Sequence, residues 1–185
     1  MAYFPHFRLL AFSCLGLSLP LLNGCCANNV CERDDSLADA IVLRFSKDTV
    51  SATGRGFHLA DLDTIILRRY PYPYDAKTTK FDSVTLIRNR LQARDSIVLN
   101  NSTPFAQVNT STKLNAYAYE VLYLMHPPKR GARTRISLIN KVLLEGVFEG
   151  DGCCTYYTNT RKEVFVNGEA TSRNLSTNNV LVLEK

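Results

Sequence analysis

The fold is decided by the stretch Asn115-Ala-Tyr-Ala-Tyr-Glu-Val-Leu-Tyr-Leu-Met125. Its apolar residues alternate between two faces, as successive side chains of a β-strand do. Leu122 and Leu124 fall on one face, and the other face carries Tyr117, Tyr119, Val121, Tyr123 and Met125. This pattern predicts a long strand that turns one face toward a core.

Short runs rich in β-branched residues lie on both sides of this strand and are bounded by Asp, Asn, Pro or Gly, which is the usual strand signal. Gly146 interrupts one of them and predicts a bulge. Asn167-Gly168 predicts a tight turn, because both positions tolerate positive φ. The prolines and glycine of 126–135 predict a loop, and 149–152 predicts a turn. The runs are 40–45, 64–70, 83–88, 96–99, 136–139 continuing through 142–148, 153–157, 163–166 and 180–183.

These runs, without an amphipathic helix or a domain-scale linker, predict an all-β protein with a single domain over residues 37–185. We expect a two-sheet β-sandwich of immunoglobulin-like or transthyretin-like type, with a small barrel as the alternative. The chain has no Trp, which argues against an antibody-type domain.

The first 25 residues carry a targeting signal. Arg8 precedes an apolar run of ~14 residues, which is too short to span a bilayer. The run ends in Leu22-Asn23-Gly24-Cys25, which resembles the lipobox of bacterial lipoproteins. The resemblance implies a signal peptide over 1–24, removed by cleavage, and a diacylglycerol on Cys25, with further acylation such as palmitate at the new amino end. An ordinary secretory signal is the alternative.

A polar tether follows over 25–36. Residue 26 is Cys and not Asp, so the common signal for inner-membrane retention is absent, and we expect anchoring in the outer membrane. The acidic Glu32, Asp34 and Asp35 resemble a signal for surface display, but a plain linker and the periplasmic leaflet remain open.

The chain has a formal net charge of +5, and loss of residues 1–24 would remove a single charged residue, Arg8. A mild positive charge suits contact with anionic surfaces, but it lacks the dense basic stripe of a nucleic-acid binder. We therefore expect the membrane, envelope glycans or another envelope protein as partners, and no nucleic acid.

Four of the six cysteines remain once Cys14 leaves with the signal and Cys25 carries lipid. In an oxidising compartment an even number favours disulfides. The three possible pairings stay open. We favour bridges from one pair to the other, because adjacent cysteines close a strained ring. The four are Cys26, Cys31, Cys153 and Cys154.

Two segments offer contact surfaces. Alternating Tyr and Pro in 70–74 favour an extended loop that displays Tyr70, Tyr72 and Tyr74, which could stack on sugars or a protein partner. The other is a basic cluster that could touch lipopolysaccharide phosphates or anionic headgroups. Its members are Lys129, Arg130, Arg133 and Arg135. A connecting loop and a solvated hairpin tip are the alternatives.

Asp followed by Ser or Thr and then an apolar residue recurs five times. The triplet resembles the acceptor sequence of a bacterial O-glycosylation system. Turns that end in Asp-Ser or Asp-Thr before a β-branched strand explain it equally. The acceptors would be Ser36, Thr49, Thr64, Ser83 and Ser96.

Catalytic signatures are absent from the sequence: it has no Gly-x-Ser-x-Gly, Ser-x-x-Lys or His-Glu-x-x-His motif. His58, Asp61 and Asp63 could approach a metal, but nothing places them on one face, and we expect no metal and no cofactor. The sequence therefore predicts a non-enzymatic, lipid-anchored envelope protein. A carbohydrate-binding module and an envelope hydrolase with an unrecognised site are the alternatives.

Overall fold

The computed structural model describes residues 37–50, 54–75, 77–78, 80–106, 113–124, 133–151 and 154–185. In this part of the chain nine strands form two sheets, and two single-turn 3₁₀ segments, η3 (Leu59–Asp61) and η4 (Leu114–Ala116), lie wholly within it. The predicted all-β class is confirmed. The signal peptide, Cys25 and the tether lie outside the described residues.

The small sheet has the strand order β4-β1-β9. Its central strand β1 (Ile41–Phe45) pairs antiparallel with β4 (Ile97–Leu99) and parallel with β9 (Val180–Leu183). Alternate side chains of β1 are fully buried, so this sheet turns one face toward the core.

The large sheet is antiparallel throughout, in the order β3-β2-β5-β6-β7-β8. The predicted long strand is β5, which lies inside this sheet, and its face with Tyr119, Val121 and Tyr123 belongs to the core. The strands are β2 (Thr64–Pro71), β3 (Asp82–Ile87), β5 (Tyr117–Leu124), β6 (Arg133–Asp151), β7 (Cys154–Val166) and β8 (Arg173–Asn174).

The core fills the space between the two sheets. Phe57, which is 1% exposed, lies edge-on to Phe45 of β1 and to Tyr123 of β5, with ring centroids 5.6 and 6.0 Å away. The large sheet and the small sheet therefore share one apolar interior. Neither sheet closes on itself, so the sandwich forms and the alternative barrel does not.

Strands β6 and β7 are longer than predicted. β6 begins at Arg133, inside the predicted loop, and continues to Asp151, through most of the predicted turn. β7 is one strand where two were predicted. The predicted bulge at Gly146 is confirmed by a register shift between Glu145 and Gly146. Asn167 and Gly168 have φ of 54° and 76°, which confirms the turn before β8, a strand that the sequence did not predict.

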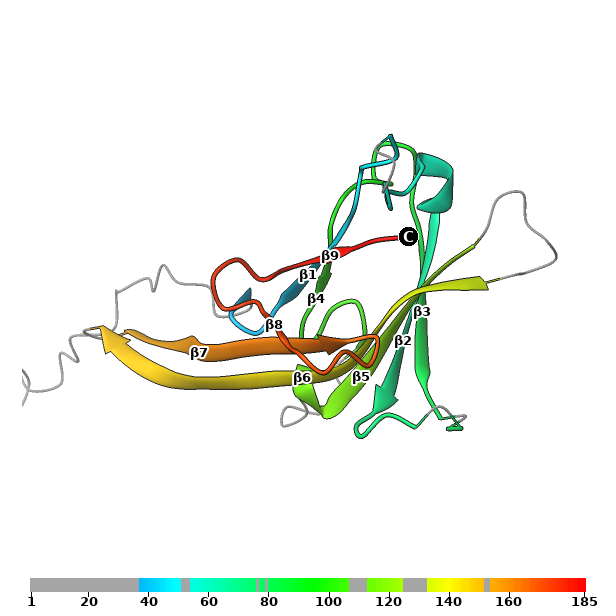
Figure 1. Ribbon diagram of the computed structural model, residues 1–185. Helices are drawn as coiled ribbons and strands as arrows, with labels where there is room; N and C mark the ends of the chain where they lie inside the picture. The colour runs from blue at the N-terminus through cyan, green and yellow to red at the C-terminus, as the bar shows by residue number, and fades with distance from the viewer. Residues whose placement is uncertain are drawn as a thin grey trace, which may run out of the picture.

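The hairpin of β6 and β7 projects beyond the small sheet, as Figure 1 shows. We call its outer part, residues 145–151 and 154–160, the hairpin end. Because the small sheet does not cover it, Val147 and Phe148 are exposed there.

Candidate functional site

Tyr70 is a buried strand residue and is not displayed to solvent as predicted. It lies near the end of β2, and its hydroxyl donates a hydrogen bond to Glu120 Oε2 of β5 at 2.9 Å. Arg68 Nη1 lies 3.2 Å from the same carboxylate oxygen. Burial and the hydrogen bond to Glu120 raise the pKa of the Tyr70 hydroxyl. The Tyr70 hydroxyl therefore serves first as a hydrogen-bond donor to the buried Glu120 carboxylate.

Two further rings pack around Tyr70. Tyr74 lies edge-on to it at 5.2 Å between centroids, and Phe81 lies at 5.3 Å. The Arg68 guanidinium lies over the Phe81 ring, 4.8 Å from its centroid. Tyr72 and Phe81 remain 43% and 41% exposed. We call Tyr70, Tyr72, Tyr74 and Phe81 the aromatic corner. Of the three predicted tyrosines Tyr72 is exposed, Tyr74 is half-buried and Tyr70 is buried, and Phe81 is a second exposed ring that was not predicted.

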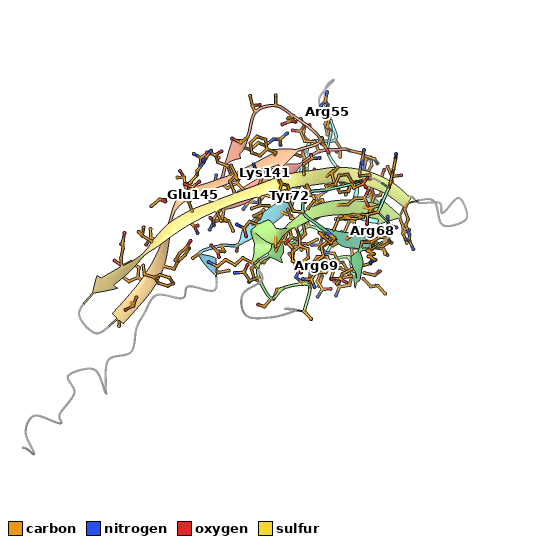
Figure 2. The ribbon with its side chains drawn as sticks, turned by 90° about the horizontal axis from the view of Figure 1, so that it is seen from below. Arg55, Arg68, Arg69, Tyr72, Lys141 and Glu145 are labelled. Carbon is orange, nitrogen blue, oxygen red and sulfur yellow. The ribbon has the colours of Figure 1, made fainter. Side chains whose placement is uncertain are left out.

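Arg69 points to the opposite face of β2. Its guanidinium lies between Phe105 and Tyr117, at 4.9 and 4.7 Å from their ring centroids. Nε also donates to Asp82 Oδ2 at 2.7 Å. These contacts hold the Arg69 side chain buried at the edge of the core. Figure 2 labels Arg68 and Arg69 on one part of the large sheet, and Lys141 and Glu145 further along β6.

Only half of the predicted basic cluster can be placed. Arg133 and Arg135 are exposed residues of β6, and not of a loop, while Lys129 and Arg130 lie outside the described residues. Arg133 pairs with Leu124 at the end of β5. The two arginines therefore stand at the end of β6 that is opposite to the hairpin end.

The predicted glycosylation acceptors differ in exposure. Thr49, Ser83 and Ser96 are exposed, and Thr64 is half-buried at the start of β2. Ser36 lies outside the described residues. Three of the positions are therefore open to a modifying enzyme, and modification itself stays a prediction.

The carboxylate of Asp61 is already occupied. Its Oδ2 accepts hydrogen bonds from the backbone N–H of His58 at 3.0 Å and from Lys185 Nζ at 2.7 Å. Within the residues described, no group of three His, Cys, Asp or Glu side chains could hold a metal ion. The arrangement of His58, Asp61 and Asp63 gives no reason to add a metal.

Among the candidate disulfide cysteines, Cys154 alone is described. It begins β7 at the hairpin end, opposite Asp151, and it is not free. Cys26, Cys31 and Cys153 lie outside the described residues, so the pairing stays a prediction.

The structure contains a buried lysine that the sequence did not predict. Lys162 of β7 is 1% exposed, and its Nζ donates to the carbonyl oxygens of Ala38 and Ala40 and, at 2.7 Å, to Asn179 Oδ1. Burial lowers the pKa of Lys162. Charged neighbours on both sides made Lys162 look solvent-facing. Strand alternation could have found it, because Lys162 shares a face with the buried Val164 and Val166.

Together these features define a small all-β sandwich whose described residues include no group of side chains that could hold a metal ion. No family model, no curated protein and no solved structure matches the chain. Among the described residues no helix is long and apolar enough to span a membrane.

Proposed function

We propose that the protein is a non-enzymatic lipoprotein of a bacterial envelope, anchored in the outer membrane through Cys25 and acting by contacts of its sandwich surface. The observation that carries this proposal is the apolar run that ends in Leu22-Asn23-Gly24-Cys25. Several acyl chains on one residue would anchor the domain stably, whereas a single chain binds only marginally.

The intact mass of the protein extracted from native membranes tests the anchor. We expect the mass of residues 25–185 plus acyl chains, and the mass of an unlipidated chain after Cys25→Ser substitution. A wild-type mass without lipid, or a chain that begins elsewhere, would remove the anchor and leave a secreted β-protein.

The same measurement tests two covalent features. Reduction should raise the mass by about 4 Da if two disulfides are present, and the disulfide-bonded Cys154 supports at least one. Hexose-sized increments would support glycosylation at the exposed Thr49, Ser83 or Ser96. No shift on reduction would leave the thiols free or bound to a metal.

A second candidate function is carbohydrate capture at the aromatic corner. Exposed rings stack on the apolar faces of sugars, and Tyr72 and Phe81 are the exposed rings of this corner. Arg68, held over Phe81 and against Glu120, adds hydrogen-bond donors beside them.

A glycan array tests this second function. Binding should be lost on Tyr72→Ala and kept on Leu91→Ala, since Leu91 is an exposed apolar residue outside the corner. Absence of binding across a broad array would count against carbohydrate recognition and leave a protein partner as the ligand class for this surface.

A further inference from the structure

The side chain of Lys162 reaches from one sheet to the other. Lys162 belongs to β7 of the large sheet and is 1% exposed. Its Nζ donates to the carbonyl oxygens of Ala38 and Ala40, which precede β1, and at 2.7 Å to Oδ1 of Asn179, which precedes β9. Strands β1 and β9 pair with each other in the small sheet, above β7 in Figure 1. The lysine amine therefore lies against a side-chain amide that borders the other sheet.

The backbone of Asn179 is held in place from both sides. Its N–H donates to the Leu175 carbonyl at 3.0 Å, and its carbonyl accepts the Val42 N–H at 2.7 Å. Its φ is 55°, in the left-handed region that Asn and Gly adopt most readily. Because Oδ1 lies 2.7 Å from Lys162 Nζ and a C=O bond is ~1.2 Å long, the amide carbon Cγ is within about 4 Å of the amine. The amine and the amide carbon are thus held close to the separation from which a bond can form.

Asp39 supplies an acid–base group beside the amine. It lies between the two alanines whose carbonyls bind Lys162 Nζ, and it is 7% exposed. Its Oδ1 accepts from Asn159 Nδ2 and its Oδ2 from Asn101 Nδ2, both at 3.2 Å. In the unreacted chain burial lowers the pKa of Lys162, and the attraction of the Asp39 charge opposes this only in part. Burial therefore favours the neutral, nucleophilic amine, and Asp39 is placed to take up its proton.

We propose that Lys162 and Asn179 form an intramolecular isopeptide bond that links the large sheet to the small sheet. The neutral Nζ of Lys162 attacks Cγ of Asn179, a new N–C bond forms, and the Cγ–Nδ2 bond breaks with release of ammonia. Asp39 accepts the proton that Nζ loses and returns it to the departing Nδ2. The step needs no oxidant, reductant or second substrate, because one amide replaces another.

The bond adds a covalent link to the apolar core that the two sheets share. It closes a loop that runs from β7 through β8 to the start of β9, and unlike a disulfide it is not opened by reducing agents. Strand β9 therefore stays attached to the large sheet when the core between them opens.

Tryptic mapping of the reduced and alkylated full chain tests the bond. An unlinked chain gives peptides 163–173 and 174–185 separately. Amide formation blocks cleavage after Lys162, so peptide 162–173 should be joined to peptide 174–185 in a branched species with two amino ends. Its mass should lie about 17 Da below the sum of the two peptides, because ammonia has been lost. Fragmentation should locate the branch at Lys162 and Asn179.

Two neighbouring asparagines provide a matched pair of variants. Asn179→Ala should give only separate peptides. Asn178→Ala should keep the branch, because the Asn178 side chain is exposed and accepts from the Val180 N–H instead. Asp39→Asn should lower the branched fraction roughly tenfold or more, since it keeps the size of the side chain and removes the proton acceptor.

The wild-type chain decides the matter first. Separate peptides without a branched species would overturn the proposal, however the variants behave. A branch that persists in Asn179→Ala would also overturn it, because another side chain would then be the acceptor. An undiminished branch in Asp39→Asn would overturn the part assigned to Asp39.

Discussion

The same two strands, β6 and β7, build two regions of different character. Where the small sheet covers them, Ile139, Val142 and Val164 are at most 3% exposed and belong to the shared core. At the hairpin end, Val147 and Phe148 are 47% and 72% exposed. Apolar burial holds the first region, whereas a few specific polar contacts and close packing hold the second. The difference comes from coverage by the small sheet and not from strand pairing.

The largest effect should come from the covered region. Phe57→Ala should lower the free energy of unfolding by roughly 3–5 kcal/mol, because a buried ring between Phe45 and Tyr123 is replaced by a cavity. Phe148→Ala at the hairpin end should cost less than about 1 kcal/mol, as its ring is mostly exposed. Urea unfolding of both variants measures the difference. Equal losses would show that the hairpin end is buried in the native protein.

The covered region was also the part that the sequence predicted best. Alternation in β5 predicted a long strand with two distinct faces, and the β-branched runs located most strands, because burial of one face forces that pattern. Strand β7 was divided in two, since 158–163 is polar and carries no apolar alternation. Its pairing depends instead on β6 and on Lys162, which bonds to residues far away in the chain.

The site was harder to predict for a related reason. The pattern of 70–74 suggested three displayed rings, yet Tyr70 is buried by its bond to Glu120 and by Phe81. That partnership depends on the register between β2 and β5, which no local motif encodes. Exposed Tyr72 was predictable from the loop itself, whereas the role of Phe81 was not.

The next largest effect should come from Lys162, the buried lysine of β7 that lies next to the hairpin end. Lys162→Ala should cost about 2–4 kcal/mol, because it opens a cavity and leaves the Ala40 carbonyl and Asn179 Oδ1 without their buried donor. Arg161→Ala, one residue away and exposed, should cost much less, because its ion pairs are screened by solvent. Urea unfolding compares them. Equal costs would mean that charge on β7 matters and that the buried contact does not.

The pH dependence of Lys162 sharpens this prediction. Burial lowers the pKa of Lys162 in the folded state, so between that pKa and the unfolded value of about 10.4 the unfolded chain binds more protons. Stability from this residue should therefore rise with pH in that window, and the desolvation cost should persist in full below it. The wild type should gain stability relative to Lys162→Met as pH rises toward 10. A constant difference would place the folded pKa at its ordinary value.

The smallest effect should come from a glycine pair within the hairpin end. A Cβ at Gly146 would lie 2.5 Å from the Thr158 carbonyl oxygen and 2.6 Å from the Tyr157 ring, whereas one at Gly150 would meet nothing within 4 Å. Gly146→Ala should therefore cost about 1–3 kcal/mol through overpacking, and Gly150→Ala should change stability by at most about 0.5 kcal/mol. Urea unfolding again measures both. If Gly146→Ala were as mild as Gly150→Ala, Tyr157 could leave the bulge freely, and the hairpin end would depend on its polar contacts alone. A clear gap between the two variants would show that close packing over the bulge also stabilises this uncovered region.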